Sequence, residues 1–205
     1  MAGLAMSPAC AQPAAEGDTA VRTQIVEAAT EPRVESPPLV AAARARMGVT
    51  RTYDGAYTRL DYPGGDVEDW KGVCTDVVVR AYRAAHGFDL QRAVHEDMRA
   101  EFGAYPDIWG LQGPDRNIDH RRVPNLETWF ARQGAELTGG DFRAGDVVSW
   151  RLDGRLPHIG VVSDRRAFDG TPLIIHNIGA GTREEDVLHA FPVHRHFRFV
   201  PEDAS

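Results

Sequence analysis

The sequence predicts an α+β fold, in which N-terminal helices pack on a C-terminal antiparallel sheet. Up to residue 134, apolar residues recur at helical spacing and the segments stop at glycines. After Gly145, short β-type runs follow one another. Helices first and strands second, in that order along the chain, are typical of the α+β class.

The helical half begins with residues 23–47, which Pro37 and Pro38 divide. Its second part, 39–47, ends at Gly48. Residues 49–73 are rich in Tyr, Asp and Gly, which predicts a strand fragment followed by an ordered loop. Further helices are expected at 90–102 and 124–134, on either side of a loop at 103–122 that contains Pro and Gly.

The segment 74–87 is an amphipathic helix in this interpretation, and Gly87 supplies its C-terminal stop. One face of the helix carries Val77, Val78, Ala81, Tyr82 and Ala85.

Four strands are predicted, at 146–152, 158–164, 172–178 and 194–200. Asp-Gly pairs at 153–154 and 169–170 favour tight reversals between the first three strands. We therefore expect these three strands to be antiparallel neighbours.

Length and composition bound the classes of protein that the chain can belong to. It has 205 residues, 42% of them hydrophobic and 26% charged, which suits a single domain over 23–205 with a helical insertion around 88–125. The formal net charge of −7 disfavours nucleic acid as a partner. No run of about 18 apolar residues occurs, so we expect no membrane span. We also expect a monomer.

Residues 1–22 are rich in Ala, Pro and Ser, and we interpret them as a disordered tail or a signal-peptide remnant. Ala9-Cys10-Ala11 has the form that signal peptidase cuts, although no Lys or Arg precedes it. Cys10 and Cys74 are the two cysteines of the chain, which is too few for a disulfide framework, and they lack the spacing of a zinc site.

Cys74 is the candidate nucleophile because it stands at the predicted start of the 74–87 helix. Free backbone N–H groups and the helix dipole favour a thiolate there, which lowers the pKa of the thiol. The alternative is a buried structural cysteine, the commoner state of a lone cysteine.

A thiolate nucleophile requires a base, and His158 opens the strand HIGVVSD directly after the predicted hairpin. A third group must then orient the imidazole. His176 and Asn177 stand at the end of the neighbouring strand, and either can serve. Because successive strand residues face opposite sides, only one of them can point at His158, and the residues leave that choice open.

Together these features resemble the NlpC-type papain-like cysteine peptidases, which cut amide bonds in peptidoglycan stem peptides. The resemblance lies in Cys74, in the strand start at 145–148, in the segment 158–162, and in Ile175 with His176. It implies a papain-like fold in which Cys74 is the nucleophile, His158 the base and His176 the orienting group.

The same family has a Tyr about a dozen residues before its Cys, near a pair of glycines. Tyr62 with Gly64 and Gly65 is similar to that element. The resemblance implies that the Tyr62 hydroxyl helps to polarise the scissile carbonyl.

More closely, residues 48–200 resemble a bacterial family called domain of unknown function 1287, which is assigned to that superfamily. The matching stretches are YPGGDV (62–67), GVCTDV (72–77), VHEDM (94–98), NIDHRRVPNL (117–126) and HNIG (176–179). Their combination is specific to that family.

One departure from the NlpC pattern places a carboxylate next to the candidate nucleophile. The usual Asp-Cys-Ser-Gly reads Val-Cys-Thr-Asp here, over residues 73–76. Asp76 either opposes thiolate formation or takes part in a hydrogen bond that supports the site, and we include it among the candidate substrate-binding residues.

The insertion contributes four further candidates for substrate binding, namely Asp119, His120, Arg121 and Arg122. Two adjacent arginines near a cleft can clamp a substrate carboxylate through paired N–H donors. Alternatively, Asp119 and Arg122 form local ion pairs that brace the start of the next helix.

Three histidines near the C-terminus, His189, His194 and His196, suggest a metal site, since residues 194 and 196 share one side of a strand. No third ligand has convincing spacing, so we prefer a solvated edge strand. No metal and no cofactor are implied.

The sequence therefore predicts a periplasmic or secreted cysteine hydrolase that cleaves an amide bond in peptidoglycan-derived peptides. Two alternatives stay open. One is a catalytically inactive module that binds cell-wall peptides, and the other is an acyltransferase in which an amine or alcohol replaces water.

Overall fold

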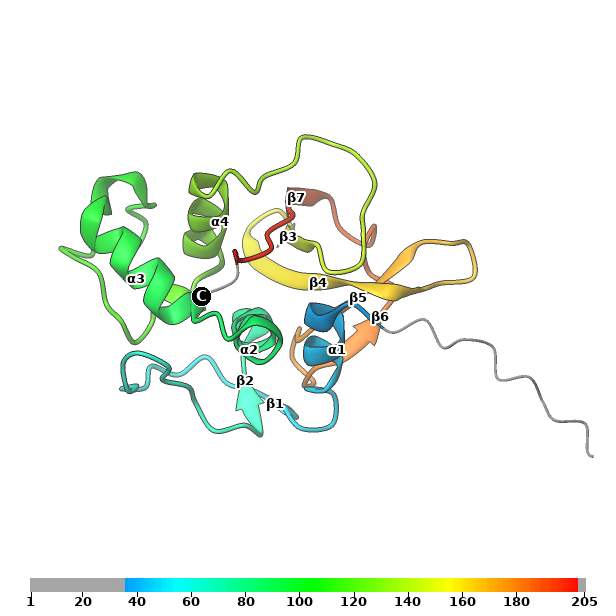
Figure 1. Cartoon of the computed structure of the whole chain (residues 1–205), viewed down its shortest axis with the longest axis horizontal. Coiled ribbons are helices and arrows are strands. Elements are labelled where there is room, and N and C mark those ends of the chain that lie inside the picture. The colour runs from blue at the N-terminus through cyan, green and yellow to red at the C-terminus, as the bar shows by residue number, and fades with distance from the viewer. Residues whose placement is uncertain (1–35, 203–205) are drawn as a thin grey trace, which may run out of the picture. The chain divides into compact units, whose positions relative to one another are not determined.

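A computed structural model describes residues 36–202 of the chain (Figure 1). The tail expected over 1–22, including Cys10, and most of the first helical segment from residue 23 lie outside the described residues. Within 36–202, no helix is long and apolar enough to cross a membrane.

Over residues 36–202, four α-helices and an antiparallel sheet of five strands make an α+β fold, as the sequence predicts. The helices are α1 (Pro38–Arg44), α2 (Cys74–His86), α3 (Leu90–Ala100) and α4 (Val123–Arg132). Two 3₁₀ turns, η1 (Phe102–Ala104) and η2 (Asp119–Arg121), lie in the segment that joins α3 to α4.

The ends of α2 follow from the local sequence. The Asp76 carboxylate accepts the Val73 backbone N–H at 2.7 Å, which satisfies a donor at the helix start. At the other end, Gly87 adopts a left-handed conformation with φ of 63°, which glycine tolerates because it has no Cβ.

The main sheet has the strand order β6-β5-β4-β3-β7. Its strands are β3 (Val147–Leu152), β4 (Leu156–Arg166), β5 (Pro172–His176), β6 (Arg183–Glu185) and β7 (Val193–Phe197), and all neighbours are antiparallel. The Asp-Gly turns join β3 to β4 and β4 to β5, as expected. A separate parallel pair, β1 (Thr52–Tyr53) and β2 (Lys71–Gly72), precedes α2.

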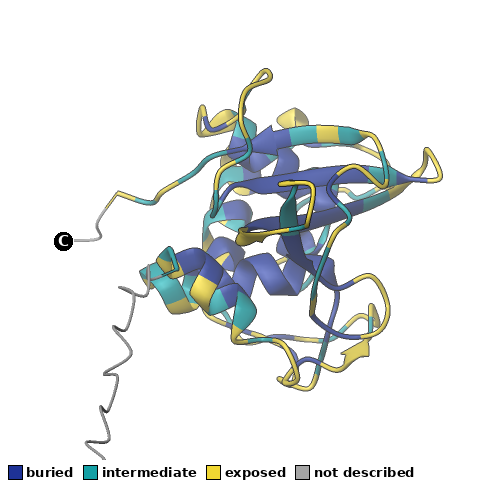
Figure 2. Cartoon of the chain, turned by 90° about the vertical axis from the view of Figure 1, so that its right-hand side faces the viewer, coloured by how far each residue is buried: buried dark blue, intermediate teal, exposed yellow. Residues whose placement is uncertain are grey.

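The main core lies between the helices and one face of the sheet. Helix α2 buries Val77, Val78, Ala81 and Tyr82 there, in agreement with the predicted apolar face, while Ala85 is only partly buried. Figure 1 shows α1 and α2 lying against the strands, and Figure 2 shows that the facing parts of the helices and strands are buried.

A second, smaller core covers the opposite face of the sheet. Trp150 and Ile174 contribute to it from β3 and β5, and Leu188 covers them from the segment that follows β6. The Trp150 indole Nε1–H donates to the Leu188 carbonyl at 3.1 Å, which fixes that segment. The sheet is therefore buried on both faces.

One strand has different bounds from the prediction and another was not predicted, and both differences matter for the site. Strand β4 begins at Leu156 instead of 158 and runs to Arg166, so His158 lies inside a paired strand. Strand β6 was not predicted, because Arg183–Glu185 is a short, charged run without apolar alternation.

Candidate active site

Cys74 is the first residue of α2, and its sulfur is almost fully buried. The backbone N–H groups of Ile159 and Thr75 and the Tyr53 hydroxyl contact the sulfur, and all three favour the thiolate. Burial opposes them more strongly and raises the pKa of Cys74 to about 11, with a smaller contribution from the Asp76 charge.

The expectation of a lowered Cys74 pKa is therefore wrong. A helix N-terminus favours a thiolate, but that effect is modest compared with the removal of a charged sulfur from water. The closed environment of Cys74 keeps the proton on sulfur at neutral pH.

His158, His176 and Glu185 form a continuous chain of hydrogen bonds. His158 Nε2 lies 2.9 Å from His176 Nδ1, and His176 Nε2 lies 3.1 Å from Glu185 Oε2. Both imidazoles are buried, and the Glu185 side chain is 36% exposed. The structure thus brings His158 together with His176, one of the two residues that the sequence left open as its orienting group.

The strand register explains why these three side chains meet. Val161 pairs with Ile175, and Ile174 pairs with Glu185, so His176 has His158 and Glu185 as diagonal neighbours on one face. Gly160 separates His158 from Val162 on that face. A Cβ at Gly160 would lie 2.7 Å from an Ile174 methyl group and 3.1 Å from the His176 Cβ.

The hydrogen-bond chain fixes the tautomer of each imidazole. As a carboxylate, Glu185 only accepts, so His176 donates from Nε2 and its Nδ1 is an acceptor. His158 must then donate from Nε2 to His176, which leaves a lone pair on His158 Nδ1. This is the protonation state that a general base requires.

Cys74 is linked to the strand that carries His158 by the backbone of Ile159. Within residues 36–202 there is no direct hydrogen bond between the Cys74 sulfur and the His158 ring; the N–H of the next residue, Ile159, reaches the sulfur instead. Burial and the neighbouring His176 lower the pKa of His158 to about 3. Both members of the candidate pair are consequently uncharged at neutral pH.

Asn177 has a separate role. Its side chain is fully buried, where Nδ2 donates to the Gly72 carbonyl at 3.1 Å and Oδ1 accepts the Gly179 N–H at 3.2 Å. It ties the end of β5 to β2, immediately before Cys74, and so positions the helix start.

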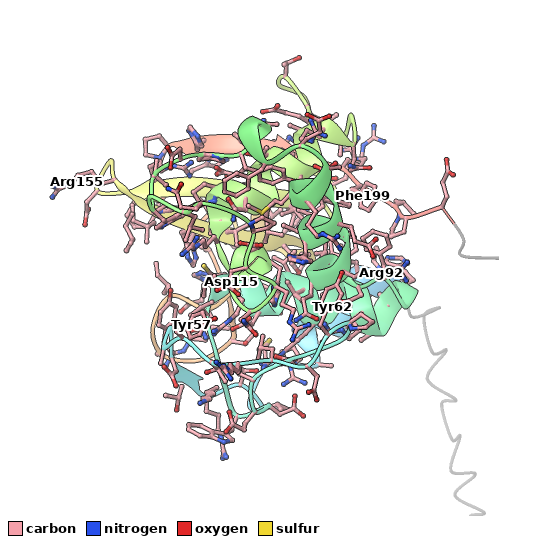
Figure 3. The ribbon with its side chains drawn as sticks, turned by 90° about the vertical axis from the view of Figure 1, so that its left-hand side faces the viewer. Tyr57, Tyr62, Arg92, Asp115, Arg155 and Phe199 are labelled. Carbon is pink, nitrogen blue, oxygen red and sulfur yellow. The ribbon has the colours of Figure 1, made fainter. Side chains whose placement is uncertain are left out.

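Tyr53, and not Tyr62, is the tyrosine that lies beside the thiol. The Tyr53 hydroxyl hydrogen-bonds Cys74, and burial together with the neighbouring thiol raises the pKa of Tyr53 to about 12. Tyr62 packs edge-on against His95 of α3, at 5.2 Å between ring centroids, and lies beside Arg116. Figure 3 shows Tyr62 beside α3.

Asp76 and Arg121 form a buried ion pair beneath the site. Arg121 Nε and Nη2 each lie 3.0 Å from a carboxylate oxygen of Asp76, and Arg121 also donates to the carbonyls of Asp54 and Ala56. The two residues join α2, η2 and the loop after β1. Their hydrogen-bonding groups are thus occupied within the protein.

Asp119 and His120, which we had also expected to bind substrate, are not among the described residues that line the cleft beside Cys74. Asp119 and His120 are buried, and burial raises the pKa of Asp119 to about 6 and lowers that of His120 to about 3. Asp119 lies 3.4 Å from His95 Nδ1, and within the described chain it forms no ion pair with Arg122. The alternative of a direct ion pair between Asp119 and Arg122 is therefore wrong, although the two charges still attract each other at longer range.

A cleft of about 420 Å³ opens beside the thiol. Cys74 and Tyr53 lie on its wall together with Trp109, Arg122 and Arg155. The tyrosine, the tryptophan and Arg155 had not been predicted, because they belong to a two-residue strand, a loop and a turn, none of which leaves a periodic signal in the sequence.

The C-terminal histidines do not gather around a common point. His196 is buried, and its Nε2 lies 2.7 Å from Asp146 Oδ2, whereas His194 is exposed. The prediction that both side chains are solvated is therefore right for His194 and wrong for His196. Among the described residues, no group of three His, Cys, Asp or Glu side chains is arranged to hold a metal ion.

Comparisons with known proteins place the chain in a family. Residues 40–199 match the family described as "Domain of unknown function (DUF1287)". The chain is 57% identical over 161 residues to "Uncharacterized protein YijF" of Escherichia coli (strain K12), an alignment that covers 77% of this chain and 78% of that relative. On the strength of this extended match, the chain belongs to the DUF1287 family.

Proposed function

We propose that the protein is a cysteine hydrolase of the NlpC-type papain-like class that cleaves an amide bond, with peptidoglycan stem peptides as its substrate. The observation that carries the proposal is the hydrogen-bond chain Glu185–His176–His158, which leaves an unprotonated Nδ1 on His158, next to the residue whose N–H contacts Cys74. Such a chain is what a thiol nucleophile needs from its base.

In the proposed reaction, the Cys74 sulfur attacks the carbonyl carbon while its proton passes to His158 Nδ1. Because thiol and imidazole both start uncharged, His158 acts as a general base at the moment of attack. The backbone N–H of Cys74 at the helix start is the candidate donor to the oxyanion. The C–N bond then breaks, and the leaving amine takes the proton from His158.

The second half of the reaction restores the enzyme. Water attacks the thioester carbonyl and gives a proton to His158, the C–S bond breaks, and the proton returns to sulfur. The products are a carboxylic acid and an amine, and no cofactor takes part. Because the proposed substrate is cell-wall peptide, we propose a periplasmic or secreted location.

A direct test compares purified muropeptides after incubation with the parent protein, with Cys74→Ala and with Cys10→Ala. The proposal predicts new products with the parent and with Cys10→Ala but not with Cys74→Ala. The masses of the two products should add up to the mass of the substrate plus one water. Identical product profiles for the parent and Cys74→Ala would reject it. Added amines would be incorporated into the product if the reaction is acyl transfer.

One observation favours a second candidate, a catalytically inactive module that binds wall peptides. The raised Cys74 pKa, together with the lack of a direct sulfur–imidazole hydrogen bond in the described residues, is compatible with an inert thiol. In that case the parent and Cys74→Ala would bind muropeptides equally and neither would release product.

A further inference from the structure

The cleft beside Cys74 has an unusual charge for an acidic protein. The whole chain carries a formal charge of −7, yet the described residues that line the cleft include Arg121, Arg122 and Arg155 and no Asp or Glu. A positively charged cleft with partly apolar walls concentrates anions. Whether it does so here depends on which of the three arginines are already neutralised.

Arg121 is neutralised by the protein itself. Its guanidinium makes two hydrogen bonds to the buried Asp76 carboxylate and two more to backbone carbonyls. It therefore has little capacity left for a ligand.

Arg122 has no such direct partner, although the Asp115 and Asp119 carboxylates lie close enough to attract its charge. Its guanidinium stacks on the Trp109 ring at 4.0 Å, and both side chains line the cleft. Within residues 36–202 it forms no ion pair and no hydrogen bond, and its Nη1 is buried without a partner. A planar guanidinium held by an indole, with donors unused, is ready for a ligand with paired oxygen acceptors.

Arg155 adds a second positive charge at the mouth of the cleft. It is exposed at the tip of the β3–β4 hairpin, as Figure 3 shows, and its side chain has no acidic partner in the described part of the chain. At the rim it contributes mainly long-range attraction, whereas Arg122 offers direct contact.

We propose that this cleft recognises a carboxylate on the substrate, close to the bond that Cys74 attacks, with Arg122 as its paired-donor contact and Arg155 as a guiding charge. The inference rests on the proposed function for the meaning of the site, and it narrows the substrate to peptides that carry a free acid near the scissile amide. It also divides the predicted arginine pair: Arg122 binds substrate and Arg121 supports the fold.

The charge of the cleft can be measured without any hydrolysis, by alkylating Cys74 with iodoacetate or with iodoacetamide. In both reactions the thiolate displaces iodide and forms an S–C bond, but only iodoacetate carries a carboxylate. We expect the iodoacetate-to-iodoacetamide rate ratio at Cys74 to exceed that of a small free thiol at the same pH. It should fall about five- to tenfold in Arg122→Gln and by a smaller factor in Arg155→Gln.

The matched control is Arg92→Gln, which removes the same charge from an exposed helix site paired with Glu96. That variant should keep the parental ratio. Arg155→Gln alters only an exposed hairpin tip, so it tests the proposal even if Arg122→Gln folds poorly. An unchanged ratio in both cleft variants, or failure of both reagents to alkylate Cys74, would overturn the proposal.

Protection experiments distinguish a carboxylate from a phosphate as the bound anion. N-acetylalanine should slow the alkylation of Cys74 by iodoacetamide, N-acetylalanine amide should not, and Arg122→Gln should abolish the protection. Protection by inorganic phosphate alone would contradict a carboxylate site. Because these alkylation rates are measured without substrate turnover, they test the anion site even if the muropeptide experiment shows no hydrolysis.

Discussion

Glu185 lies 3.1 Å from His176 Nε2, at the end of a chain of hydrogen bonds that leads to His158. Of the three side chains in this series of hydrogen bonds, the Glu185 carboxylate alone cannot donate. It therefore sets the direction of both hydrogen bonds. Glu185 is thus a positioning residue for the imidazole that we propose as the base.

We expect Glu185→Gln to disturb this direction, because a glutamine amide can donate as well as accept. Proposed hydrolysis should fall about 10- to 100-fold, a range typical of groups that orient a functional histidine. Imidazole ¹⁵N chemical shifts should change from a single Nε2–H tautomer of His176 to a mixture. Glu68→Gln, at an exposed carboxylate paired with Lys71, is the control. Unchanged His176 shifts in Glu185→Gln would show that the carboxylate does not fix the tautomer.

The two tyrosines before Cys74 give a paired comparison. Tyr53→Phe removes a hydroxyl that favours the thiolate, so the pKa of Cys74 should rise further and alkylation at a fixed pH should slow about two- to tenfold. Tyr62→Phe should leave that rate as it is, because Tyr62 packs against His95 and Arg116. The rate of iodoacetamide labelling measures both. If Tyr62→Phe slowed alkylation more than Tyr53→Phe did, Tyr62 would be the tyrosine that acts on the thiol, as the resemblance implies.

Asp76→Asn should destabilise the fold because it leaves Arg121 buried without its charge partner. Removal of one member of a buried pair costs about 3–5 kcal/mol, whereas an exposed pair contributes roughly 1 kcal/mol at most. Urea unfolding should show this contrast between Asp76→Asn and Glu96→Gln, which breaks the exposed Arg92–Glu96 pair. Equal losses of unfolding free energy in the two variants would mean that Asp76 does not support the fold as described.

Acid should destabilise the protein through its buried neutral histidines. Burial lowers the pKa of His120 to about 3, below its value of about 6.5 in the unfolded chain. Between these values the unfolded state binds a proton that the folded state does not, so stability falls as the pH drops from about 6.5 towards 3. The contribution is about 1.4 kcal/mol per pH unit.

Urea unfolding from pH 4 to 7, in the parent and in His120→Leu, isolates this contribution because the other titrating groups are shared. The dependence of the unfolding free energy on pH should be shallower in the variant. Parallel curves would indicate that His120 takes up a proton in the folded state.

Residues in regular elements were predictable because local spacing determines their place. The apolar spacing of α2 and its stop at Gly87 gave the position of Cys74, and the Asp-Gly turns gave the hairpins that carry His158 and His176. For both the helix and the hairpins, a short-range pattern settles the structure.

Contacts made from very short strands and loops were not predictable in the same way. Glu185 lies in a three-residue charged strand, and Tyr53, Tyr57 and Tyr62 all lie in a region without periodicity, so nothing local shows which of them reaches the thiol. The direction of the Cys74 pKa shift depends on how deeply the folded protein buries the thiol, and the sequence around Cys74 does not contain that information.

The most direct test of the account is whether His158 controls the reactivity of Cys74. The rate of Cys74 alkylation by iodoacetamide should be followed from pH 6 to 11 in the parent and in His158→Ala. The account predicts that the variant reacts at least about tenfold more slowly near pH 7, where the imidazole takes the thiol proton, and approaches the parent as the pH nears the Cys74 pKa of about 11. Superimposable pH profiles would contradict a Cys74–His158 pair.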